Sequence, residues 1–216
     1  MHPDIEQPAD ASPIRLRPVS RLRPQAIAVG CSTGGPQALQ AFLEALRPPL
    51  DLPVFVVQHM PATFTAILAA QLARECGADC HEGQDGEPVG AGRIYIAPGG
   101  HHMSVERRGD AEPVIRIHRQ APVNFCRPSV DVLLDGLAKV YDCRVLTVML
   151  SGTGEDGLAG VRAVVAGGGM AVAQDAGTSV AWGMPGAVAR AGLCTAVLPP
   201  GEIGARVRGL VAGSAA

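Results

Sequence analysis

Aromatic residues are scarce in this 216-residue chain, where they make up 3% of the sequence and include a single tryptophan. Proteins that bind single-stranded nucleic acid use aromatic side chains as stacking platforms, and this chain has too few to build one. A strong charge of either sign is also lacking, because the formal net charge is −2. We therefore expect neither nucleic acid nor a membrane surface as a partner.

Long apolar runs and paired cysteines are missing as well. No stretch approaches the ~18 consecutive apolar residues of a membrane-spanning helix, and the N-terminus lacks the basic-then-apolar pattern of a secretory signal. The cysteines form no C-x-x-C pair, and Cys76, Cys80 and His81 lack the usual spacing of a zinc site. We expect a cytoplasmic protein with reduced thiols, no bound metal and no cofactor.

The chain does contain 47% hydrophobic residues, and they alternate between strand and helix patterns. Strand patterns occur at 26–30, 54–58, 93–97, 145–150 and 170–173. This alternation predicts an α/β fold, a doubly wound and mainly parallel sheet with helices on both faces. Residues 103–118 predict a β-hairpin insertion. In such a fold the site lies at the carboxyl ends of the strands.

The first 24 residues differ from the rest, since they contain several prolines and show no apolar periodicity. Residues 1–24 are predicted to form a disordered or extended lead-in, and residues 25–216 a single catalytic domain. In the helix expected to end near Cys76, Thr63 is the predicted N-cap, and Phe64 and Ile67 are predicted to face the core.

Residues 26–36 are the most informative segment, because they read as a buried strand, a tight turn and the start of a helix. Ser32 occupies the centre of a G-x-S-x-G pattern at 30–34, which is typical of a nucleophile elbow. A serine there exposes its hydroxyl beside the positive end of a helix, where an oxyanion could be stabilised. A phosphate-binding loop and a plain structural turn are the alternatives.

A base and an acid also follow strand ends. His59 comes directly after the strand at 54–58, and Asp156 lies in the loop after the strand at 145–150. A histidine at that edge can accept the proton of Ser32, and a carboxylate can hold the other ring nitrogen. These residues predict a serine hydrolase.

Other residues compete for each role. His101 and His102 follow another strand and are alternative bases, and Cys31 is a rival nucleophile that we expect to pack inward instead. The acids that compete with Asp156 are Asp131, Asp135 and Asp175.

With these motifs together, the chain resembles the catalytic domain of the chemotaxis receptor methylesterases, the CheB-type protein-glutamate methylesterases. The resemblance covers about residues 25–211. Its landmarks are Gly-Cys-Ser-Thr-Gly-Gly at 30–35, Gln-His-Met-Pro at 58–61, Tyr-Ile-Ala-Pro-Gly at 95–99, Pro-Val-Asn at 122–124, Arg-Pro-Ser-Val-Asp at 127–131, Gly-Glu-Asp-Gly at 154–157 and Gly-Met-Pro at 183–185.

The resemblance implies that Ser32 is the nucleophile, His59 the base and Asp156 the orienting acid. Around them we expect oxyanion and site-lining residues at Thr33, Gly34, Gly35, Met60 and Thr153. The implied activity is hydrolysis of γ-glutamyl methyl esters on chemoreceptor cytoplasmic helices, with release of methanol, and deamidation of receptor glutamines. The implied partners are those methylated helices and a separate response regulator or signalling protein.

The chain departs from the family pattern at several points. Cys31 and Thr153 stand where the family commonly has alanine and methionine, and residues 1–24 are too short for the N-terminal receiver domain that members often carry. Two other functions compete with methylesterase: a non-catalytic signalling adaptor with the same fold, and a general small-ester esterase. The full set of Ser32, His59 and Asp156 argues against the adaptor, and the lack of an extra apolar segment argues against the general esterase.

Overall fold

The computed structural model describes residues 13–46 and 50–212. They form a seven-stranded sheet in the order β3-β4-β2-β1-β7-β8-β9, in which every pairing is parallel. The strands are β1 (Ala26–Cys31), β2 (Val54–Gln58), β3 (Asp79–Glu82), β4 (Arg93–Ile96), β7 (Val145–Met149), β8 (Met170–Gln174) and β9 (Ala196–Leu198). The strands β1, β2, β7 and β8 are buried throughout, as expected for a parallel sheet covered on both faces.

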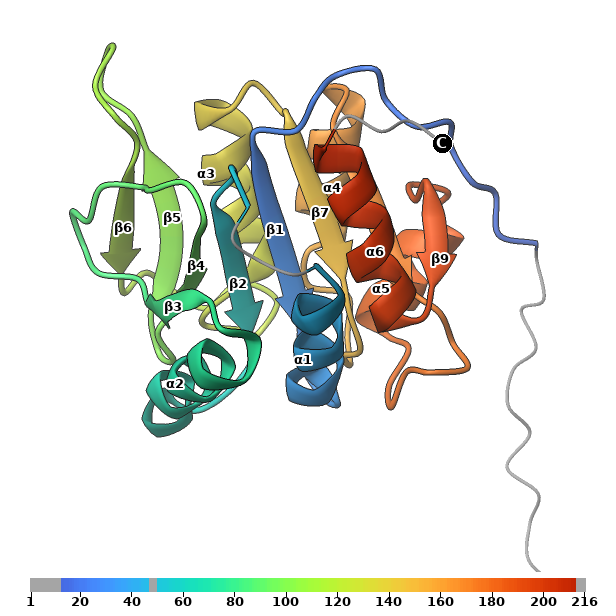
Figure 1. Cartoon of the computed structure of the whole chain (residues 1–216), viewed down its shortest axis with the longest axis horizontal. Helices are drawn as coiled ribbons and strands as arrows, with labels where there is room; N and C mark the ends of the chain where they lie inside the picture. Colours follow the sequence, from blue (N-terminus) through green and yellow to red (C-terminus); the bar gives the residue numbers. More distant parts are fainter. Residues whose placement is uncertain (1–12, 47–49, 213–216) are drawn as a thin grey trace, which may run out of the picture.

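Helices cover both faces of this sheet (Figure 1). One face packs against α1 (Gly35–Leu46), α2 (Ala62–Cys76) and α6 (Pro200–Val211). The other packs against α3 (Val130–Val140), α4 (Leu158–Ala166) and α5 (Met184–Arg190). The predicted doubly wound α/β fold is therefore confirmed.

The predicted hairpin is present and forms a ribbon of its own. Strands β5 (His102–Glu106) and β6 (Val114–His118) pair antiparallel, and β5 packs against α3. Met103, Val105 and Ile115 are buried and join the core on that face. The ribbon thus extends the core beyond the edge of the main sheet.

Two predictions about the region after β2 are wrong. Thr63 does not cap α2: Pro61 takes the N-cap position without a side-chain bond, and Phe64 and Ile67 are exposed. The helix instead turns Thr65 inward, where its hydroxyl contacts Glu82 and accepts a hydrogen bond from the Gly99 N–H at 3.1 Å. Strand β3 was not expected, because its residues are mostly polar and it pairs on one side only.

The described part of the lead-in, residues 13–24, contains no helix or strand and runs along the amino edge of the sheet (Figure 1). The Arg17 N–H donates to the Cys194 carbonyl at 2.8 Å, and the Ser20 hydroxyl donates to the Gly168 carbonyl at 2.7 Å. Residues 1–12 of the predicted lead-in lie outside the described residues.

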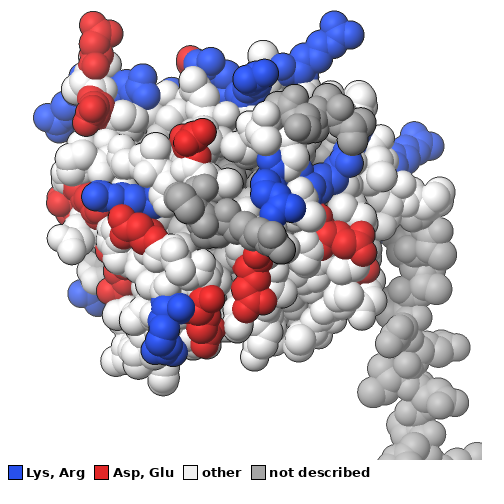
Figure 2. All heavy atoms as spheres, viewed as in Figure 1, with Lys and Arg blue, Asp and Glu red and all other residues white. Residues whose placement is uncertain are grey.

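Charge is mixed on the surface: basic and acidic side chains are interspersed over the face seen in Figure 2. Within residues 13–46 and 50–212, no helix has the length and apolarity required to cross a membrane.

Candidate active site

Three neighbouring strands of the sheet carry the predicted site. Strand β1 pairs with β2 on one side and with β7 on the other. Ser32 follows β1, His59 follows β2, and Asp156 lies in the loop between β7 and α4. Because the carboxyl ends of parallel strands share one edge, the three residues come from adjacent positions at that edge.

Ser32 lies in a tight turn that leads straight into α1. The Gly35 N–H donates to the Ser32 carbonyl at 2.8 Å, and Gly34 has a φ of +75°, a conformation that favours glycine. The Ser32 N–H donates to the Ser151 carbonyl at 2.9 Å. Gly152 comes so close that a side-chain carbon there would lie 3.0 Å from Ser32 Cβ. The turn after β1 is thus held by the loop after β7.

His59 and Asp156 form an ion-pair contact, with Nε2 2.9 Å from Oδ2 and side-chain exposures of 15% and 2%. Three further donors hold the carboxylate: the Ser129 hydroxyl at 2.6 Å, the Val130 N–H at 2.7 Å and the Asn124 amide at 3.0 Å. Val130 is the first residue of α3, so Asp156 also lies at the positive end of a helix.

Two opposing effects act on the pKa of Asp156. Burial raises it, but the hydrogen bonds from His59, Ser129, Val130 and Asn124 together lower it further, and the net pKa is below the usual carboxyl value. The carboxylate is therefore ionised at neutral pH and can stabilise a positive charge on His59.

The ring of His59 presents its two nitrogens in a defined way. Because Nε2 contacts Asp156, Nδ1 is the nitrogen that remains to accept a proton. This is the reverse of the chymotrypsin arrangement, in which Nδ1 contacts the aspartate. The Cys126 sulfur lies 3.7 Å from Nδ1. Ser32 and His59 are both among the described residues, and no hydrogen bond joins the Ser32 hydroxyl to His59.

Gln58 connects the turn at Ser32 to His59. Its side-chain amide donates to the Ser32 carbonyl at 2.9 Å and to the His59 carbonyl at 3.0 Å. The side chain is buried, and a side-chain carbon at residue 35 would lie 2.1 Å from its oxygen. Glycine at 35 therefore makes room for the residue that links Ser32 to His59.

The predicted oxyanion residues do not all remain available as donors. The Gly35 N–H is used within the turn, whereas the N–H groups of Thr33 and Gly34 take no partner among the described residues. Met60 is half-buried after His59, and Thr153 is exposed in the loop after β7. The turn at the start of α1 thus offers two free N–H groups beside Ser32.

The alternative base and nucleophile occupy structural positions. His102 is fully buried and its Nε2 contacts the Ala121 carbonyl at 3.1 Å, and burial lowers its pKa. Cys31 is fully buried against the Val57 carbonyl, and burial raises the pKa of its thiol far above the usual value. His101 is half-buried in the turn before β5.

The alternative acids also have other partners. Asp131 accepts from the Asn124 amide at 2.8 Å and from the Gly160 N–H at 2.7 Å, which joins α3 to α4. Asp135 pairs with Lys139 on the surface of α3 at 2.6 Å. Asp175 accepts from the Thr178 N–H at 3.1 Å. None of the three contacts a histidine within the described part of the chain.

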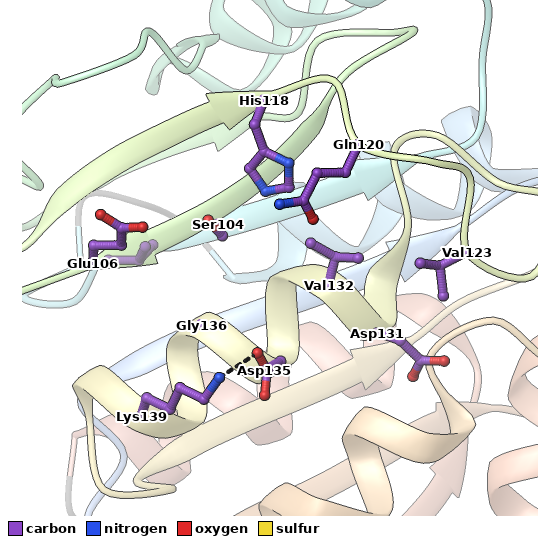
Figure 3. Close-up of a pocket in the computed structure, with 11 residues that line it drawn as sticks. Ser104, Glu106, His118, Gln120, Val123, Asp131, Val132, Asp135, Gly136 and Lys139 are labelled. Atoms are coloured by element: carbon purple, nitrogen blue, oxygen red, sulfur yellow. Dashed lines mark hydrogen bonds and ion pairs between the residues drawn. The ribbon is translucent and has the colours of Figure 1, made fainter.

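A cavity of about 430 Å³ lies beside this site, between α3 and the β5–β6 ribbon (Figure 3). Ser32, His59 and Asp156 do not line it. Asp131 does line it, and Asn124 connects Asp131 to Asp156. The cavity therefore borders Asp131, which shares the Asn124 amide with Asp156, and not the three predicted site residues themselves.

His59, Cys126 and Asp156 are close enough to hold a metal ion, since their ligand atoms lie within 4.8 Å of one another. Both carboxylate oxygens already accept hydrogen bonds, however, and His59 Nε2 is engaged as well. Only the Cys126 sulfur and His59 Nδ1 remain, which is fewer than the three protein ligands of a catalytic zinc.

The supporting residues Asn124, Cys126, Ser129 and Gln58 received no role from the sequence. Gln58, Asn124 and Ser129 belong to the quoted motifs, and this was the only indication of a role in the sequence. The contacts that join them to Ser32 and Asp156 span 26 to 32 positions. Cys126 had no such signal.

Comparison with known proteins places this geometry in context. A family model described as CheB methylesterase matches residues 27–207. A protein-glutamate methylesterase/protein-glutamine glutaminase of Rhodospirillum centenum is 48% identical over 208 residues, covering 96% of this chain and 52% of that protein. One from Azospirillum brasilense is 49% identical over 203 residues, covering 91% and 51%. The chain thus spans about half the length of the curated relatives it matches.

A solved structure is similar across its whole length. The crystal structure of the Thermotoga maritima CheB methylesterase catalytic domain superposes with a TM-score of 0.84 at 35% sequence identity. The match covers 87% of this chain and 99% of that one.

Proposed function

The chain belongs to the CheB methylesterase family, and on that premise we propose that it is a serine hydrolase that demethylates γ-glutamyl methyl esters of chemoreceptors. The same site would deamidate receptor glutamines, since both reactions add a nucleophile to a side-chain carbonyl. The proposed partners are the methylated cytoplasmic helices of the receptor and a separate response regulator or signalling protein. The proposed location is the cytoplasm.

One observation carries this proposal: the 2.9 Å contact between His59 Nε2 and an Asp156 carboxylate that three other donors hold in place. It leaves Nδ1 as the ring nitrogen with a free lone pair, and Ser32 and His59 follow neighbouring strands at the same edge of the sheet. A base in that tautomer can take the hydroxyl proton of Ser32 as its oxygen attacks the ester carbonyl.

The steps follow from these roles. The developing oxyanion would be stabilised by the free N–H groups of Thr33 and Gly34 and by the positive end of α1. Protonated His59 gives its proton to the departing methoxide, and methanol leaves an acyl-Ser32. Water, deprotonated by the same nitrogen, then releases the glutamate. In deamidation the leaving group is ammonia.

Ser32→Ala tests the proposal directly. We expect methanol release from a methylated receptor fragment to fall by about 10³-fold or more, because the attacking atom is removed while the turn is unchanged. The wild type should also prefer the receptor ester over a simple aryl ester. A purified, folded variant that retained more than about a tenth of wild-type turnover would exclude Ser32 as the nucleophile.

A further inference from the structure

The exposed large apolar side chains within residues 13–46 and 50–212 fall into two groups. Four of them, Ile14, Leu16, Val19 and Leu22, belong to the lead-in at the amino edge of the sheet. The other four all follow the carboxyl ends of strands, at the edge that carries Ser32. We call this second group the apolar rim, and it consists of Phe64, Ile67, Phe125 and Val180.

Phe125 shows the most unusual placement in the rim. Val123 and Cys126 exchange two backbone hydrogen bonds, and the two residues between them, Asn124 and Phe125, have φ values of 51° and 61°. A two-residue turn with both φ values positive favours glycine at its second position, and an aromatic residue is unfavourable there. The Phe125 side chain is nevertheless fully exposed and gains no packing within the described chain.

The neighbours of Phe125 fix it beside the reacting groups. The Asn124 amide donates to Asp156, and the Cys126 sulfur contacts His59 Nδ1. The ring therefore projects from a turn whose neighbouring residues contact the proposed acid and base. Strained backbone that holds an exposed side chain at a site favours a functional explanation over a structural one.

The remaining members surround the same site. Phe64 lies in the first turn of α2, five residues after His59, and Ile67 lies one turn further on the same helix face. Val180 packs against the turn after Ser32, since a side-chain carbon at Gly34 would lie 2.6 Å from Val180 Cβ. Apolar side chains from three segments thus follow strands at the edge of the sheet that carries Ser32, His59 and Asp156.

We propose that the apolar rim docks the apolar stripe of an amphipathic helix in the protein substrate, next to the esterified glutamate. This inference rests on the proposed function. An ester at the end of a glutamate side chain reaches Ser32 only if the surface of its helix approaches this edge. An amphipathic helix presents apolar residues three and four positions apart, and these would pack on Phe125 and Phe64.

The test compares two substrates, a methylated receptor cytoplasmic fragment and a small aryl ester. Phe125→Ala and Phe64→Ala should each lose at least about tenfold more kcat/KM on the fragment than on the aryl ester, mainly through KM. The matched control is Leu16→Ala, which removes an exposed apolar side chain at the opposite edge and should lose no more on one substrate than on the other. Equal losses on both substrates for the rim variants would overturn the proposal.

A measurement of fragment binding tests docking by the rim independently of the proposed reaction. Ser32→Ala should bind the fragment, and adding Phe125→Ala should weaken that binding by about tenfold, whether or not the ester is hydrolysed. Unchanged binding would overturn docking by the rim.

Phe125→Gly distinguishes a role of the ring in docking from a role in stabilising the fold. It should raise the melting temperature, because glycine adopts positive φ without strain, while kcat/KM on the fragment falls. A lower melting temperature would show that the ring supports the fold instead.

Discussion

At the scale of single residues, the carboxylate of Asp156 joins three separate parts of the chain. It accepts hydrogen bonds from His59 after β2, from Asn124 in the turn, and from Ser129 and Val130 at the start of α3. Each donor requires a lone pair in return. An amide cannot supply all of these lone pairs, because its nitrogen is a donor.

Asp156→Asn should therefore lower turnover by up to about 10⁴-fold, since the amide cannot stabilise a protonated His59. It should also destabilise the fold, because a buried donor would be left facing another donor; from the sequence alone little change in stability would be expected. Turnover on methylated receptor and urea unfolding measure the two effects.

Glu155→Gln provides the control, because Glu155 is adjacent and acidic but exposed. It should cost less than about tenfold in turnover. Equal losses in the two variants, or a larger loss at Glu155, would contradict the proposed role of Asp156.

At the scale of elements, the predictable parts were those set by local pattern. The buried runs in β1, β2 and β7 predicted both the sheet and the edge where Ser32, His59 and Asp156 lie. The polar strand β3 could not be predicted, because its pairing with β4 depends on neighbours and not on its own apolar residues.

The face of α2 and the contact of Cys126 depend on distant partners. Thr65 faces inward because its hydroxyl forms hydrogen bonds there with Glu82 and Gly99. The spacing of apolar residues along α2 does not indicate those partners. Cys126 reaches His59 only through the turn at 123–126. Hydrogen bonds between residues distant in the sequence, and not the spacing of apolar residues, thus determine which face of α2 is buried and where Cys126 lies.

The packing of α1 on α6 gives a prediction for these two elements. A side-chain carbon at Gly204 would lie 2.4 Å from the Phe42 carbonyl oxygen, which is backbone and cannot move aside cheaply. Gly204→Ala should lower the free energy of unfolding by about 1–3 kcal/mol, as overpacking does.

Gly201 in the same helix is the matched control, because nothing lies within 4 Å of a side-chain carbon there. Gly201→Ala should be neutral or stabilising by up to about 1 kcal/mol. Urea unfolding of both variants decides the point, and equal effects would show that α1 and α6 are not in close contact.

At the scale of the whole molecule, the lowered pKa of Asp156 links folding to pH. Its pKa is lower in the folded chain than in the unfolded chain, so the ionised form contributes stability at neutral pH. That contribution is complete above the unfolded value of about 3.9 and is lost as pH falls through the folded value.

Ser129→Ala isolates this effect, since it removes one donor to the carboxylate. At pH 7 it should lower the free energy of unfolding by about 1.5–3 kcal/mol, the range for a hydrogen bond to a charged group. The difference from wild type should narrow as pH falls through the lowered pKa of Asp156 in the folded chain, because a protonated carboxyl needs that donor less. Unfolding curves from pH 7 to pH 3 measure it, and a constant difference would argue against the linkage.

Strand β1 is synthesised early and paired late. One edge of β1 pairs with β2, which follows closely in the sequence, as Ile27 with Val54. The other edge pairs with β7, more than a hundred residues later, as Ala26 with Val145, and the Ser32 N–H bonds to the Ser151 carbonyl beyond it. At a translation rate of ~5–20 residues per second, one edge of β1 stays open for several seconds on the ribosome. An open strand edge is a template for aggregation, so the nascent chain is most vulnerable in this interval. The Ser32 N–H can form its hydrogen bond to the Ser151 carbonyl only after residue 151 has left the exit tunnel.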